Sequence, residues 1–408
     1  MEILKAKLMS LSVYKNMLET PQVASLLELC EAKTPDALLR AYTDFVYSVW
    51  REGFDTLSES VYHHLCYDDS FIGDAIAKNR ASEALQNAAA MDIRRLSAIS
   101  VLSCSALKRN IYNFCVSKNQ DYGPIVQNLA ELRPGKGFTE EAVFSHYRTH
   151  GCGIFSQSMA FVWEKGKLMP VQNPDRICQD EMYGYHQQRN AVLENTRILV
   201  SGRPANNVLL YGDSGTGKSA MVKSLINSPE FYNLRLIEIQ KNSLDELGTL
   251  SRYLDGRPQR FIIYIDDLSF EKEDKAFSAL KTALEGGLER RPDNVAIYAT
   301  SNRRHLIRES FEDRAGTDVH ARETLEERTS LSERFGLRIA YLALNKADYT
   351  SMVIEMCHRR ALPFDEATIR TRANQWEIRH GGRTPRAAVQ LVDQLTGEAE
   401  LMGTGKNS

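Results

Sequence analysis

Residues 212–219 constrain the fold of this chain more than any other part of the sequence. They read Gly-Asp-Ser-Gly-Thr-Gly-Lys-Ser, which is the spacing of a phosphate-binding P-loop. An apolar, β-prone run at 208–211 comes directly before them, and a helical pattern follows from Ala220. A strand that turns into a helix through such a loop is typical of an α/β fold, in which helices cover a parallel sheet.

The residue types of this loop suit a nucleoside triphosphate. Glycines let the backbone wrap around phosphates with its N–H groups, and Lys218 offers a cation to the β- and γ-phosphates. The hydroxyl of Ser219 is a ligand for Mg²⁺. The predicted nucleotide-binding residues here are Gly212, Asp213, Ser214, Gly215, Thr216, Gly217, Lys218 and Ser219.

Composition and charge limit the partners and the compartment. The net charge of −2, without a basic or acidic tail, argues against bulk attraction to nucleic acid or anionic membranes, although a local basic patch stays open. The seven cysteines are odd in number and dispersed, which favours free thiols. The first residues carry charges, and no apolar run reaches 18 residues, so we expect a cytoplasmic protein with no membrane partner.

The pattern along the chain predicts four parts. Residues 1–150 read as a helical N-terminal domain that binds a client or partner, and 151–180 as a β-hairpin linker built on 154–171. Strands and helices alternate in 181–344, and 345–408 read as a helical lid. The expected fold is a five-stranded parallel sheet with helices on both faces, with strands near 206–211, 234–240, 261–265, 295–299 and 337–344. The lid helices are expected near 346–361, 365–380 and 385–402.

Two histidine clusters in the N-terminal part raise the question of a metal. They contain His63, His64 and Cys66 in one case, and His146, His150 and Cys152 in the other. Neither supplies the four ligands that a zinc site needs, so we interpret both as ordinary core or surface residues.

Polar residues follow two of the predicted strands. Asp266 and Asp267 come directly after 261–265, at the strand end where ligands bind in open α/β sheets. We expect Asp266 to hold Mg²⁺ through its water shell and Asp267 to polarise the attacking water. Asn302 ends the next strand and is placed to orient that water, although a Thr-Ser-Asn run is also a common turn. The basic cluster at 303–305 suits either a partner or a solvated helix start.

Three arginines complete the predicted catalytic set. Arg334 lies just before the fifth strand, where it could reach the γ-phosphate on a neighbouring subunit as an arginine finger. Arg383 and Arg386 open the last helix, and position favours Arg386 as the one that contacts the nucleotide. A surface arginine or a helix-start salt bridge is the alternative reading in each case.

Taken in order along the chain, these motifs resemble an AAA+ ATPase over roughly residues 175–405. Local stretches such as 206–212, 266–270 and 299–306 resemble a bacterial family of predicted AAA+ ATPases with no assigned role. The resemblance implies ATP and Mg²⁺ as cofactors, and assembly into a ring, commonly a hexamer. It assigns Lys218 and Ser219 to Walker A, Asp266 and Asp267 to Walker B, Asn302 to sensor 1, Arg334 to the finger and Arg386 to sensor 2, with Gly184 and Tyr185 lining the adenine pocket.

One departure from the AAA+ pattern bears on activity. The usual pair is Asp-Glu, and Asp267 is one methylene shorter than that glutamate, so hydrolysis is either slow or assisted by Glu271. We therefore expect an oligomeric ATPase that remodels or moves an unidentified protein or nucleic-acid client. The alternatives are an ATP-gated loader or scaffold with little turnover, and a P-loop kinase acting on a small molecule.

Overall fold

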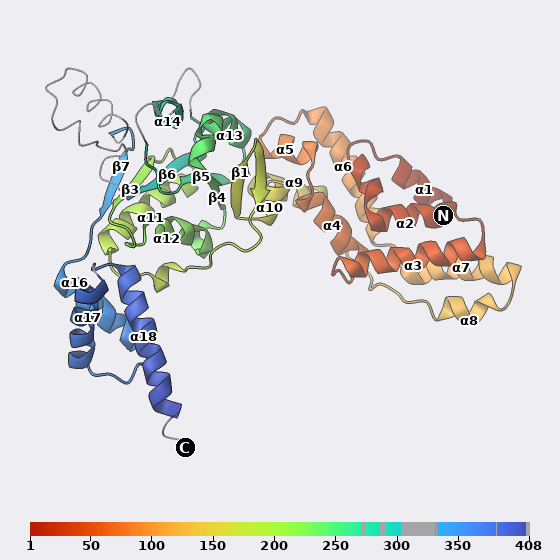
Figure 1. The fold of residues 1–408 in the computed structure, drawn as a ribbon. Coiled ribbons are helices and arrows are strands. Elements are labelled where there is room, and N and C mark those ends of the chain that lie inside the picture. The colour runs from red at the N-terminus through yellow and green to blue at the C-terminus, as the bar shows by residue number, and fades with distance from the viewer. Residues whose placement is uncertain (271–274, 286–290, 303–330, 332, 381, 405–408) are drawn as a thin grey trace. The chain divides into compact units, whose positions relative to one another are not determined.

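The computed structural model describes residues 1–408 except 271–274, 286–290, 303–330, 332, 381 and 405–408. The described chain forms two compact units (Figure 1). The first contains residues 1–157 together with 256–259, and the second contains 158–255 and 260–408.

The N-terminal unit is helical, and residues 1–157 contain no strand. Its helices pack around one hydrophobic core, to which every long helix contributes fully buried side chains such as Leu26, Val49 and Ile93. The helices are α1 (Glu2–Met9), α2 (Pro21–Glu31), α3 (Pro35–Arg51), α4 (Leu57–Tyr67), α5 (Phe71–Ala77), α6 (Glu83–Ser100), α7 (Cys104–Lys118), α8 (Tyr122–Gln127), α9 (Glu140–His150) and α10 (Ile154–Gln157).

Helix α4 shows how the sequence defines one of these elements. Thr56 is the N-cap, its hydroxyl accepts a hydrogen bond from the backbone N–H of Glu59, and the Glu59 carboxylate accepts one from the N–H of Thr56. This reciprocal capping box satisfies N–H groups that the first helical turn leaves without partners. Leu57, Val61 and Leu65 then lie on one side of α4 and are buried in the core.

The second unit is built on a sheet of seven strands, in the order β2-β1-β4-β5-β6-β3-β7. The strands are β1 (Ala160–Glu164), β2 (Lys167–Pro170), β3 (Val208–Gly212), β4 (Leu234–Ile239), β5 (Arg260–Ile265), β6 (Val295–Ser301) and β7 (Leu337–Tyr341). Neighbouring strands are parallel except β1 and β2, which form an antiparallel hairpin.

The prediction of five strands was wrong in number. The expected hairpin exists, but β1 pairs in parallel with β4 and extends the sheet rather than forming a separate linker. The stretch expected as hairpin from residue 154 begins with a helical turn, because 154–157 form α10. Five strands at the expected places are present, with ends shifted by at most three residues.

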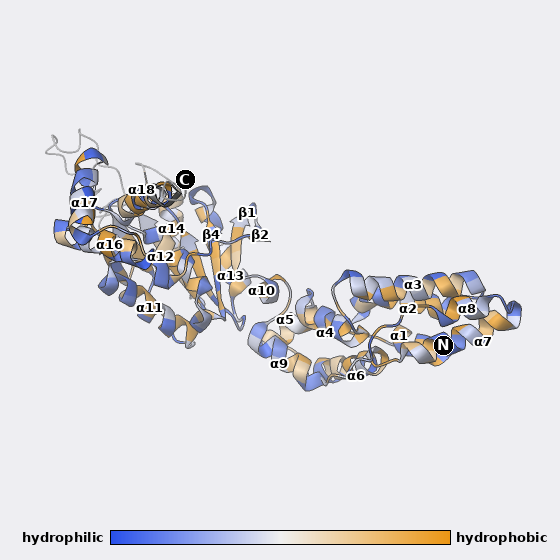
Figure 2. Ribbon diagram, turned by 90° about the horizontal axis from the view of Figure 1, so that it is seen from below, coloured by the Kyte–Doolittle hydropathy of each residue, from blue (hydrophilic) through white to orange (hydrophobic). Residues whose placement is uncertain are grey.

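Helices flank the sheet on its two faces. Figure 1 shows α11 (His186–Val200) and α12 (Lys218–Ser224) on one side, with α13 (Leu247–Leu254) and α14 (Lys275–Glu285) on the other. Alternate strand residues such as Leu210, Ile262 and Tyr298 share a buried cluster with α11 and α12. In Figure 2 the strands are mostly hydrophobic, as expected for a sheet covered on both faces.

Three helices follow the sheet, and they have a hydrophobic cluster of their own. They are α16 (Lys346–Arg359), α17 (Glu366–His380) and α18 (Pro385–Thr404). Val353, Ala373 and Val392 are fully buried where the three helices meet. Among the helices of the described residues, none combines the length and the hydropathy that a bilayer span requires.

Candidate nucleotide-binding site

The P-loop connects β3 to α12, as the sequence predicts. Gly212 has φ +129°, and a Cβ atom there would collide with the carbonyl oxygen of Tyr341 on β7. Gly215 and Gly217, at φ +76° and +91°, also have positive φ. Asp213 fastens the loop to the chain after β7, because its N–H donates to the oxygen of Tyr341 at 2.9 Å and its carboxylate accepts from the N–H of Ala343 at 2.6 Å. These two hydrogen bonds therefore anchor the start of the loop to the segment that follows β7.

Lys218 is buried at the base of the loop, with 5% of its surface exposed. Its Nζ donates to the carbonyl oxygens of Gly212 at 3.0 Å and Asp213 at 2.7 Å, and to Oδ1 of Asn302 at 3.0 Å. Burial lowers the pKa of Lys218, although the nearby carboxylates act in the opposite direction. The direct partners of this buried ammonium are uncharged oxygens, so it is available to attract an anionic ligand.

Ser219 and Asp266 meet at the carboxyl edge of the sheet. The Ser219 hydroxyl donates to Oδ1 of Asp266 at 2.7 Å, and the hydroxyl of Thr300 donates to the same oxygen at 2.5 Å. Burial raises the pKa of Asp266, but the hydroxyls of Thr300, Tyr264 and Ser219 outweigh it and the pKa is lowered. Asp266 is thus an ionised carboxylate at neutral pH. An open cavity of about 550 Å³ lies beside it, at the carboxyl ends of β4 and β5.

Asp267 and Asn302 form the second half of the same network. The side-chain amide of Asn302 donates to Oδ1 of Asp267 at 2.8 Å, while its oxygen accepts from Lys218. The N–H of Asp267 donates to the Thr300 hydroxyl at 2.9 Å. Lys218, Asn302, Asp267, Thr300 and Asp266 are therefore connected through consecutive hydrogen bonds.

The backbone of Asp267 explains why an aspartate suits this position. Its φ is +48°, in the left-handed region that aspartate and asparagine adopt more readily than longer side chains. The shorter acid that departs from the usual Asp-Glu pair thus matches the local conformation. Glu271, which we considered as its helper, lies outside the described residues.

The two candidate lid arginines differ in their surroundings. The N–H of Arg386 donates to the carbonyl oxygen of Gly215 at 3.2 Å, so the start of α18 lies directly against the P-loop. The Arg386 side chain is exposed and adds to the positive potential at Lys218. Arg383 instead pairs with Glu377 on α17 at 3.4 Å. The geometry therefore favours Arg386 as the arginine near a nucleotide.

Gly184 and Tyr185 lie just before α11. Both have positive φ, +68° and +50°, and a Cβ atom on Gly184 would meet the side chain of Met352 on α16. The ring of Tyr185 is buried against Tyr341, with ring centroids 4.9 Å apart, and its hydroxyl donates to the oxygen of Leu342 at 2.6 Å. The Tyr185 side chain is thus part of the core, and this turn offers a ligand its backbone rather than an open ring.

Arg334 lies at the opposite edge of the sheet from the P-loop. Strands β3 and β7 are parallel, with Val208 paired to Leu337 and Gly212 to Tyr341. The P-loop follows the last residue of β3, whereas Arg334 precedes the first residue of β7. The separation is on the order of 20 Å at about 3.3 Å per strand residue. Arg334 therefore cannot reach the P-loop of its own subunit. The basic cluster at 303–305 lies outside the described residues.

Sequence reasoning missed Thr300 and Tyr264. Thr300 is 2% exposed and binds both aspartates, and Tyr264 is fully buried behind Asp266, with its pKa raised by burial. Both belong to strands that read as simple apolar runs. Their spacing in the sequence could have predicted them. Thr300 lies two residues before Asn302 and Tyr264 two residues before Asp266, so each lies on the same side of its strand as a predicted site residue.

Comparison with solved structures finds similar folds at low identity. RuvB of Thermotoga maritima, described as a Holliday junction branch migration motor, is 16% identical over 53% of this chain, with a TM-score of 0.37. Two mutants of that protein give 16% identity with a TM-score of 0.38, and 15% with 0.39 over 56% of this chain. The chain spans 63% of the length of the first of these mutants and of RuvB itself, and 67% of the second mutant.

No protein of curated function matches this sequence. A family model described as "Protein of unknown function (DUF815)" matches residues 156–399, which is more than half of the chain. The prediction that the chain belongs to a family without an assigned role is confirmed. This chain belongs to the DUF815 family of proteins of unknown function.

Proposed function

We propose that this protein is an oligomeric, Mg²⁺-dependent ATPase of the AAA+ type that remodels or moves a macromolecular client. The observation that carries the proposal is the hydrogen-bond network from Lys218 through Asn302 and Asp267 to Thr300 and Asp266. It gathers a cation, two carboxylates and an amide at the mouth of a P-loop. Cytoplasmic location and the absence of a membrane partner remain part of the proposal.

The residues present fit a Mg²⁺–nucleotide complex. Mg²⁺ prefers oxygen ligands and usually keeps several waters while it binds one or two protein groups and the substrate phosphates. Ser219 and Asp266 would hold it, and the bound ion would neutralise charge on the phosphates. Among the described residues there is no cluster of three metal-binding His, Cys, Asp or Glu side chains, so the phosphates would have to supply further ligands.

Each remaining residue has a distinct task in hydrolysis. The loop N–H groups and Lys218 would bind the phosphates, and Asp267 would accept the proton of the attacking water. Asn302 would orient both Asp267 and that water, since its amide already donates to the carboxylate. Arg386 would contact the phosphates from the start of α18. Gly184 and Tyr185 would border the adenine of ATP. The sequence has an Asn-Lys-x-Asp stretch, the spacing of a guanine-reading motif, at 345–348, but there Asn345 is the N-cap of α16 and its side chain binds Asp348.

The position of Arg334 supports assembly. An arginine about 20 Å from its own P-loop can act as a finger only on a neighbour, so active sites would form between subunits, as in a ring. Under this proposal residues 1–150 bind the client, and 345–408 act as a lid.

The proposal is tested by phosphate release at increasing protein concentration, with Mg²⁺ or with EDTA. We expect Mg²⁺-dependent turnover whose rate per subunit rises with concentration. Tight ATP binding with negligible turnover at all concentrations would instead favour an ATP-gated loader or scaffold, which the short side chain of Asp267 makes the second candidate. Transfer of phosphate to a small molecule would favour a kinase.

Thr300→Val is expected to lower turnover about tenfold and to raise the Mg²⁺ concentration needed for half-maximal rate. The valine has nearly the same shape but removes one of the two acceptors of the Asp267 N–H, leaving Oδ1 of Asp266, and removes a donor to Asp266, a loss of about 1–3 kcal/mol. Thr300→Ser keeps the hydroxyl and is the matched control. The measurement is the rate of phosphate release against Mg²⁺ concentration at fixed ATP. Equal curves for Thr300→Val and Thr300→Ser would show that the hydroxyl is dispensable.

Arg386→Ala is expected to weaken ATP binding about tenfold, whereas Arg383→Ala stays within about twofold of the parent chain. A guanidinium–phosphate hydrogen bond is charge-assisted and is worth about 1.5–3 kcal/mol. Arg383 serves as the control because it is paired with Glu377 and opens the same helix. Titration with a fluorescent ATP analogue measures both, and the reverse order of effects would assign the lid contact to Arg383.

A further inference from the structure

Helix α4 of the N-terminal unit carries a stripe of aromatic and acidic side chains at the border of the core, where the rings are only partly buried. The stripe begins at Glu59, and Tyr62 and His63 lie three and four residues further on. Tyr67 lies four residues after His63, so all four residues share one side of the helix. Glu59 is exposed and the three rings are half-buried, whereas the opposite side of α4 is fully buried. These four residues are the exposed stripe of α4.

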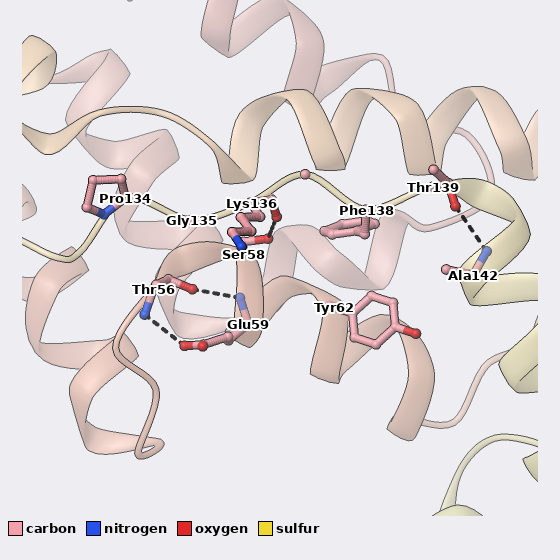
Figure 3. Close-up of a pocket in the computed structure, with 11 residues that line it drawn as sticks. Thr56, Ser58, Glu59, Tyr62, Pro134, Gly135, Lys136, Phe138, Thr139 and Ala142 are labelled. Atoms are coloured by element: carbon pink, nitrogen blue, oxygen red, sulfur yellow. Dashed lines mark hydrogen bonds between the residues drawn. The ribbon is translucent and has the colours of Figure 1, made fainter.

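Two cavities lie along this stripe and share Glu59 and Tyr62. The larger has a volume of about 690 Å³ and lies between α4 and segment 134–139, as Figure 3 shows with Tyr62 below Phe138. The smaller, of about 500 Å³, is lined by Gly53, Phe54, Asp55, Glu59, Tyr62, His63 and Tyr67. Because both cavities are lined by Glu59 and Tyr62, we treat them as one groove.

The smaller cavity is lined by rings in contact. His63 stacks on Tyr67 with centroids 4.7 Å apart, and Phe54 lies 5.2 Å from His63. Burial, and then the neighbouring His64, lower the pKa of His63, so its ring is neutral at pH 7. Asp68 and Glu52 hold His64 by hydrogen bonds and raise its pKa. The rings of this cavity therefore offer uncharged π faces, which attract cations.

The charged residues that line the smaller cavity are acidic, since no lysine or arginine lines it. Glu59 uses only Oε2 for its two hydrogen bonds, to the N–H groups of Asp55 and Thr56. Asp55 forms an ion pair of 3.1 Å with Arg133, and both side chains are more than half exposed. Such a pair is weak and exchangeable, and it places a guanidinium of the chain itself at the rim of the cavity. The one lysine of the groove, Lys136, lines only the larger cavity.

We propose that this groove binds an extended peptide segment bearing an arginine, whose guanidinium lies on the rings of the smaller cavity and pairs with Glu59 and Asp55. A guanidinium is planar, stacks on aromatic faces and binds carboxylates through two parallel hydrogen bonds, which matches the rings and acids found here better than an ammonium does. The same carboxylates repel phosphates, so a nucleic acid is a poor occupant. This inference rests on the proposed function, because it specifies what kind of client the ATPase would bind. The groove itself lies within the N-terminal unit alone.

The test measures peptide binding to the full chain without nucleotide, so that a failure here says nothing about ATP turnover. The probe is a fluorescein-labelled 12-residue Gly-Ser peptide with two central arginines, and its partner has citrulline in place of each arginine. Citrulline keeps the planar shape without the charge. Fluorescence anisotropy should show binding of the arginine peptide at least about tenfold tighter than of the citrulline peptide.

Variants of the groove locate the site. Glu59→Gln removes the charge and keeps a capping-box acceptor, so the fold of α4 is preserved and affinity for the arginine peptide should fall about fivefold. Glu28→Gln, at an exposed position of α2, loses the same charge elsewhere and should leave the affinity unchanged. Equal affinity for the two peptides, equal effects of the two variants, or tighter binding of a fluorescein-labelled single-stranded DNA oligonucleotide than of the arginine peptide would each overturn the proposal.

Discussion

Arg334→Ala should lower ATP turnover per subunit by about 10³-fold while ATP binding stays within about twofold. An arginine finger contacts charge that develops only in the transition state, so its loss reduces the rate without a comparable loss of affinity. The structure makes the effect specific to assemblies, because Arg334 lies at the far edge of the sheet from its own P-loop. Phosphate release and binding of a fluorescent ATP analogue, both measured over a range of protein concentrations, give the two quantities.

The matched control is Arg338→Ala, an exposed arginine four residues further along on β7, which should leave turnover unchanged. A mixing experiment then tests action between subunits. Arg334→Ala subunits keep an intact Asp267, and Asp267→Asn subunits keep an intact Arg334, so a mixture should recover part of the activity that each variant lacks alone. If the mixture stays as inactive as its components, the finger does not act on a neighbouring subunit.

Asp267→Asn should reduce turnover by about 10²–10³-fold and leave ATP binding intact. The substitution removes the carboxylate that would accept the proton of the attacking water, and general base catalysis typically contributes about 10²–10⁴-fold. Asparagine adopts φ +48° as readily as aspartate does and still offers Oδ1 to the amide of Asn302, so the fold of the site should be unchanged. Single-turnover hydrolysis with enzyme in excess over ATP measures the chemical step directly.

Asp245→Asn, at an exposed position after β4, is the control for the loss of one carboxylate and should behave as the parent chain does. If turnover of Asp267→Asn stays within about threefold of the parent, another residue acts as the general base, and Glu271 is the first residue to substitute next. A strong loss of ATP binding would show that Asp267 acts on the ground state, which the switch interpretation requires.

The sequence was sufficient to predict which residues meet at the P-loop. Asp266 and Asn302 end parallel strands, and the carboxyl ends of parallel strands lie at one edge of a sheet, so their approach to Lys218 follows from strand order in the sequence and apolar patterning. The choice between Arg383 and Arg386 was left to position along the chain, and contacts after folding favour Arg386.

Other features depend on pairings that no local pattern contains. The hairpin at 160–170 reads the same whether it is isolated or joined to a sheet, and only the parallel pairing of Phe161 with Ile237 makes it part of the sheet. The role of Thr300 could not be predicted for a similar reason, because it depends on contacts between distant parts of the chain. In a strand it is an ordinary β-branched residue, and its importance comes from two aspartates that lie more than thirty residues earlier in the chain.

The short segment 256–259, between α13 and β5, belongs to the N-terminal unit. Its Arg257 is 10% exposed on the side chain and lies 2.8 Å from Asp74, and the side-chain amide of Gln259 donates to the carbonyl oxygen of His150. The polypeptide therefore passes from one unit to the other three times, and no single cut separates them. A chain started at residue 158 would keep 256–259 but lose the residues that they contact, among them Asp74 and His150. The second unit expressed alone would therefore carry a four-residue segment whose packing partners are missing, so its boundaries cannot be set by a single position in the sequence.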